Sequence, residues 1–65
     1  MEDIDIWRTA AEMIRQFQED AATTAALRAD ALLDGGDVDG FHVWKRVVLA
    51  INDLQKTRPG GDTLH

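Results

Sequence analysis

The chain has 65 residues, no cysteine and a formal net charge of −5, a size that allows one small domain with a thin core. The lack of cysteine excludes disulfide bonds and thiolate metal sites, and the acidic balance is unlike a nucleic-acid surface, which normally carries a strong basic excess. No apolar run approaches the ~18 residues of a membrane span, and the acidic start is unlike a signal peptide, so we expect a cytoplasmic protein.

The first helix is predicted over about residues 4–17, with Asp3 as its N-cap. Its apolar stripe recurs every three or four residues: Ile6, Trp7, Ala10, Met13, Ile14 and Phe17. No glycine or proline ends this helix, but the polar run 18–20 favours a break, with Asp20 as the next N-cap. The alternative is one continuous helix over 4–34, which could not fold back on itself in a small domain.

The second helix is predicted over about residues 21–34 and has an alanine-rich face: Ala22, Ala25, Ala26, Ala29, Leu32 and Leu33. A face of small side chains lets a neighbouring helix approach closely, so we expect tight packing there. Leu27 projects away from this face. Gly35 and Gly36 end the helix, because glycine readily adopts the left-handed conformation found after helix C-termini.

The third helix is predicted over about residues 38–56, with Asp37 as its N-cap, and it forms an antiparallel hairpin with the second. It carries the longest apolar stripe of the chain: Phe41, Trp44, Val47, Val48, Ile51 and Leu54. We expect the two tryptophans and two phenylalanines to form much of the core, with Trp44 as its anchor. Leu49 lies outside this stripe, and residues 59–65 are predicted to be a flexible C-terminal tail.

Motifs that would carry chemistry are weak in this chain. Asp37, Asp39 and Gly40 resemble part of a calcium loop, but that register places Gly35 and Arg46 at two ligand positions that they cannot fill. A chain without serine, cysteine or tyrosine also offers few nucleophiles, and His42 has no partner ligand at helical spacing. We therefore expect no metal, no cofactor and no enzymatic activity.

Two resemblances to known families accompany this pattern. The segment from Leu32 to Gly40, followed by Trp44 and Pro59, resembles the hairpin of a single tetratricopeptide repeat, which implies the same local geometry. The runs 6–10, 20–22, 28–30, 32–33, 36–40 and 43–46 are similar to a family of short bacterial helical proteins of unknown function. That similarity implies a free-standing helical domain and carries no known site.

The sequence thus predicts an all-α fold, a small three-helix bundle that forms a single domain over residues 1–58. We expect a protein-interaction or regulatory module whose partner is a protein, including a second copy of the chain as a homodimer. Its candidate partner-binding residues are Leu27, Leu49 and Val43. The alternative is a nucleic-acid-associated regulator with a helix-turn-helix-like hairpin, which the acidic residues at the start of the third helix disfavour.

Overall fold

The computed structural model describes residues 2–56, and over that range the fold is all-α without a strand. Helix α1 spans Asp3–Phe17, and the short 3₁₀ segment η1 spans Gln18–Asp20. Helices α2 and α3 span Ala21–Asp34 and Val38–Lys56. Asp3 is the first residue of α1 and not its N-cap, a place that Glu2 takes without a side-chain cap bond. The tail expected at 59–65 lies outside the described residues.

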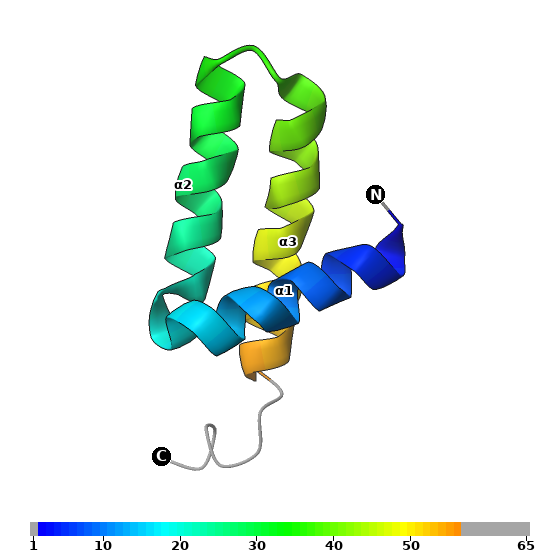
Figure 1. Ribbon diagram of the computed structural model, residues 1–65, viewed down its shortest axis with the longest axis vertical. Helices are drawn as coiled ribbons and strands as arrows, with labels where there is room; N and C mark the ends of the chain where they lie inside the picture. The colour runs from blue at the N-terminus through cyan, green and yellow to red at the C-terminus, as the bar shows by residue number, and fades with distance from the viewer. Residues whose placement is uncertain (1, 57–65) are drawn as a thin grey trace.

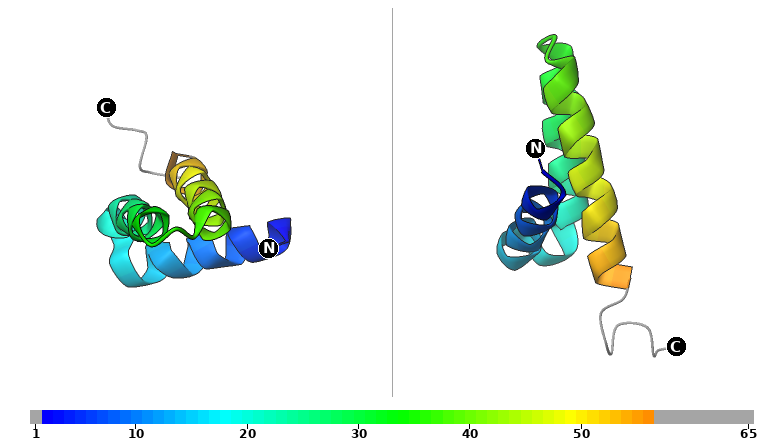
Figure 2. Two further views of the ribbon diagram at one scale, coloured as in Figure 1. Left: turned by 90° about the horizontal axis from the view of Figure 1, so that it is seen from above. Right: turned by 90° about the vertical axis from the view of Figure 1, so that its right-hand side faces the viewer.

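The α2–α3 hairpin and α1 form two layers. Figure 1 shows α2 and α3 side by side and antiparallel, with α1 running across them near the end of the hairpin away from its turn. Seen from above in Figure 2, α1 lies against one face of the hairpin, and no other described element covers the opposite face. The break expected after Phe17 is therefore present, and the helices pack together.

The corner between α1 and α2 is formed by Gln18, whose φ of 52° is unusual for a residue other than glycine. Its carbonyl oxygen accepts a 2.9 Å hydrogen bond from the Gln55 side-chain amide on α3, and it also accepts a bond from the Ala21 backbone N–H. Asp20 takes the N-cap position of α2, as expected, but its side chain makes no cap bond there. A contact from distant α3 holds this corner, and no local sequence signal reports it.

The turn between α2 and α3 follows the local signals of the sequence. Gly36 has a φ of 88°, and its N–H donates to the carbonyl of Leu33 while the Asp37 N–H donates to that of Leu32. The Asp37 carboxylate then accepts a 2.8 Å hydrogen bond from the Gly40 N–H, which confirms Asp37 as the N-cap of α3. These bonds satisfy backbone groups at both helix ends and fix the direction of the hairpin.

Small residues fill most of the core. Its buried side chains come from all three helices and are Ile6, Ala10, Met13, Ala21, Ala25, Ala29, Val47, Ala50 and Ile51. Val47 and Ile51 are the largest side chains that are fully buried, and both lie on α3. The alanines of α2 let α3 pack closely against it, and no aromatic ring is among the buried side chains of the described residues.

The expectation that aromatic residues form the core is therefore wrong. Trp7 is 43% exposed and Phe17 is 39% exposed, while Phe41 and Trp44 are half-buried. Trp44 packs against the core from its edge and is not its anchor. The physical reason is the close approach of α2 and α3, which leaves room for large rings only at the borders of the helix contacts.

Candidate functional site

The three residues predicted to bind a partner occupy different environments. Leu27 on α2 and Leu49 on α3 are each 64% exposed, whereas Val43 is half-buried and packs against the core. Each leucine lies two positions from buried residues of its own helix, about 200° around the helix axis, so it points away from the core. The structure therefore displays both leucines but does not join the three residues into one patch.

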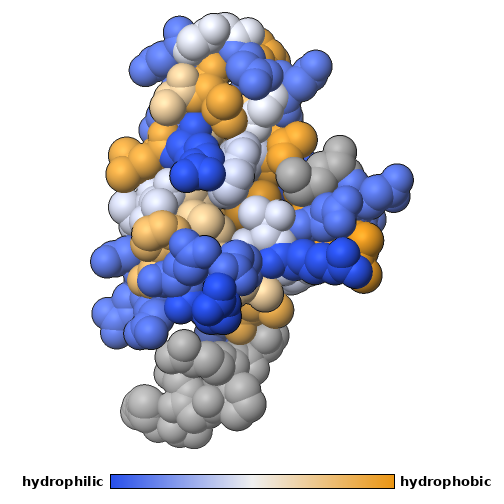
Figure 3. Space-filling view, in the orientation of Figure 1, coloured by the Kyte–Doolittle hydropathy of each residue, from blue (hydrophilic) through white to orange (hydrophobic). Residues whose placement is uncertain are grey.

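The exposed apolar residues are spread over the molecule. Figure 3 shows the face that carries α1, where hydrophobic patches are separated by hydrophilic side chains. The large apolar side chains that remain exposed come from all three helices and are Ile4, Trp7, Phe17, Leu27, Leu33, Val38 and Leu49. A small domain that buries alanine and displays leucine, tryptophan and phenylalanine has apolar surface available for contact with another molecule.

A groove of about 630 Å³ lies where α1 crosses the hairpin, and sequence reasoning did not find it. All three helices contribute to its lining, which consists of Arg8, Thr9, Glu12, Met13, Gln16, Phe17, Arg28 and Trp44. The Arg28 guanidinium lies over the Trp44 ring, 4.9 Å from its centroid, in a cation–π contact. Arg28 and Trp44 are equally distant along the chain from Gly36 at the hairpin turn, so an antiparallel hairpin places them opposite each other. This symmetry is the sequence signal that could have predicted their contact.

The charges on the α1 side of this groove are partly compensated. The hydrogen bond from Arg15 lowers the pKa of Glu12, and a second hydrogen bond from Gln16, 2.7 Å long, lowers it further. The same pairing raises the pKa of Arg15. Arg8 lies 4.0 Å from Asp5, the outer limit of an ion pair, and both side chains are exposed, so this contact contributes little. Arg8 and Arg28 are therefore the groove charges available to a ligand.

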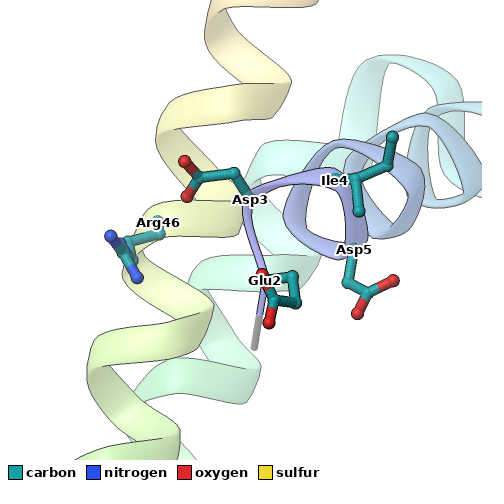
Figure 4. A pocket seen from close by; sticks show the side chains of 5 residues that line it. All are labelled: Glu2, Asp3, Ile4, Asp5 and Arg46. Carbon is teal, nitrogen blue, oxygen red and sulfur yellow. The ribbon is translucent and has the colours of Figure 1, made fainter.

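A second hollow, of about 540 Å³, is lined by the N-terminal segment and α3: Glu2, Asp3, Ile4, Asp5 and Arg46. Figure 4 shows these side chains spreading in different directions rather than converging on one point. Carboxylates dominate its lining, and among the described residues Arg46 is its sole cation. An open, acidic hollow without convergent groups gives little basis for a binding site.

The described part of the chain carries neither a cluster of metal-ligating side chains nor a membrane-spanning helix. Between residues 2 and 56, no cluster of three or more histidine, cysteine, aspartate or glutamate side chains could hold a metal ion. Asp37 uses its carboxylate as a helix cap, and His42 is exposed beside the Phe41 ring, with ring centroids 5.2 Å apart. None of the described helices is long and apolar enough to span a membrane.

Comparison with known proteins gives no further guide, since no family model, curated protein or solved structure matches this chain. The resemblances to a tetratricopeptide unit and to a family of short bacterial proteins therefore stay predictions. Function has to be inferred from the chemistry and geometry of the chain itself.

Proposed function

We propose that this chain is a small protein-interaction or regulatory module, built as a three-helix bundle and without catalytic activity of its own. The observation that supports the proposal is the distribution of apolar residues by size. Alanines make up more than half of the buried residues, while leucines and aromatic residues remain exposed. The cores of protein interfaces are enriched in aromatic side chains, so aromatic and leucine side chains left at the surface are candidates for contact with a partner.

The partner in this proposal is a protein, either a different one or a second copy of the chain in a homodimer. Leu27 and Leu49 are the candidate contact residues because each is 64% exposed on the outer face of its helix. Val43, the third candidate, is half-buried against the core and so offers less surface to a partner. Association with nucleic acid is the weaker alternative, since Asp37 and Asp39 place carboxylates at the start of α3.

Affinity capture with charged variants tests this function. Leu27→Glu and Leu49→Glu place a carboxylate on each candidate surface. Ala11→Glu and Gly35→Glu, the controls, add the same charge at exposed positions on α1 and at the hairpin turn. We expect a protein captured by the wild type to be lost with at least one leucine variant and retained with both controls. Sedimentation at several concentrations applies the same comparison to self-association.

Two results would contradict the proposal. One is monomeric sedimentation for every protein together with capture patterns that do not differ among the wild type, the leucine variants and the controls. The other is capture of nucleic acid, released by moderate salt, in place of a protein, because salt-sensitive release is typical of phosphate contacts. Circular dichroism of each variant would show that the fold persists.

A further inference from the structure

The groove between α1 and the α2–α3 hairpin is lined by both polar and apolar side chains. Arg8, Glu12 and Gln16 recur every four residues and so lie in a row along α1. The row extends over about 12 Å, since each helical residue rises about 1.5 Å. Phe17 and Trp44 supply aromatic surface to the same groove. An extended peptide of about four residues would match this length, and one of its side chains would contact the aromatic rings of Phe17 and Trp44.

The guanidinium of Arg28 is held in place within this groove. Its central carbon lies 4.9 Å from the centroid of the Trp44 ring, within the range of a cation–π contact. Among the interactions described for residues 2–56, Arg28 has no ion pair with a carboxylate. A planar guanidinium with free N–H groups matches a carboxylate, which it can bind through two parallel hydrogen bonds.

The charge of the groove contrasts with that of the whole chain. The net charge is −5, yet the groove presents Arg8 from α1 and Arg28 from α2. Its carboxylate, Glu12, is already bonded to Arg15 and Gln16. The two available charges in the groove are therefore positive and come from different helices, with aromatic surface beside them. Two positive charges with aromatic surface beside them are complementary to a ligand that has negative charges on either side of an apolar group.

We propose that this groove binds an acidic peptide segment in which a bulky apolar residue is flanked by carboxylates. The apolar side chain lies on Phe17 and Trp44, and the flanking carboxylates pair with Arg8 and Arg28. The inference rests on the proposed protein-binding function and adds to it the chemistry of the partner. It assigns the groove to a region separate from the exposed leucines, so the two ideas can be tested independently.

The test is a nuclear magnetic resonance titration with a short synthetic peptide that has a central phenylalanine between aspartates and glutamates. We expect the side-chain indole signal of Trp44 to shift and that of Trp7, which does not line the groove, to stay in place. The same peptide with asparagine and glutamine in place of its acids should bind with an affinity lower by about tenfold or more. Arg28→Ala should weaken the acidic peptide to a similar degree, whereas Arg46→Ala, outside the groove, should not.

Several outcomes would overturn the inference. They are equal binding of the acidic and amide peptides, equal losses in Arg28→Ala and Arg46→Ala, or no shift of the Trp44 signal at millimolar peptide. Tighter binding of a single-stranded oligonucleotide than of the acidic peptide would instead assign the groove to phosphate. Because none of these experiments alters Leu27 or Leu49, a negative result here leaves the capture experiment on the leucines unaffected.

Discussion

Truncation of Ile51 is the most direct test of the alanine-based core. The side chain is fully buried on α3, and no buried side-chain polar atom of the described residues lacks a hydrogen-bond partner. Ile51→Ala should therefore act through lost packing alone, which costs about 2–5 kcal/mol for a large-to-small core change. A domain of 65 residues has a total stability of about 3–10 kcal/mol, so this one change removes a large fraction of it or unfolds the chain.

Leu49→Ala is the matched control, because it shortens an aliphatic side chain on the same helix at a position that is 64% exposed. Its expected effect on a monomer is within about 0.5 kcal/mol. Urea unfolding followed by far-ultraviolet circular dichroism measures both variants without relying on the tryptophans. Equal unfolding midpoints for the two proteins, or a larger loss for Leu49→Ala, would show that α3 does not bury the face assigned to it.

Three further predictions concern local interactions. Asp37→Ala should lower the free energy of unfolding by about 1 kcal/mol through loss of the α3 cap, whereas Asp37→Asn should retain most of the cap's stabilisation in thermal unfolding. Millimolar Ca²⁺ should leave the wild-type unfolding midpoint unchanged. Gly36→Ala, at a φ of 88°, should cost about 1 kcal/mol in urea unfolding, while Gly35→Ala should be nearly neutral because its backbone is ordinary. Folding lowers the pKa of Glu12 below 4.5, so the small contribution of Glu12 to the free energy of unfolding is present above that pH and is lost as the pH falls through the lowered pKa. Glu12→Gln should remove this dependence on acidic pH in thermal melts recorded at several pH values.

The features that the sequence predicted are those with local causes. A glycine at positive φ after α2 and a carboxylate one residue before α3 act within a few positions of themselves, so Gly36 and Asp37 could be assigned without a structure. The outward orientation of Leu27 and Leu49 also follows from helical periodicity alone. The all-α class rests on the same periodicity, because three apolar stripes at helical spacing leave no alternating segment for a strand.

The features that sequence reasoning missed depend on how close the helices come. Gln18 takes a positive φ at a corner that Gln55 holds from α3, and no local pattern contains that contact. Trp44 lies in the middle of an apolar stripe, yet helix periodicity gives only a direction and not the space available in that direction. The groove could not be predicted because it depends on where α1 crosses the hairpin. That crossing brings Phe17 together with Arg28 and Trp44, which are far from it in the sequence.

A single packing choice links the thin core to the exposed apolar surface. The alanines on α2 that belong to the core allow α3 to pack closely and are themselves fully buried. Each alanine removes little apolar area from water, so the core contributes modestly to stability. The larger residues that could have enlarged it, such as Trp7 and Leu27, remain substantially exposed instead. A partner that covers them would add the apolar burial that the isolated chain lacks and would raise its stability by mass action. Under the proposed function, the thin core and the apolar surface offered to a partner therefore have the same structural origin.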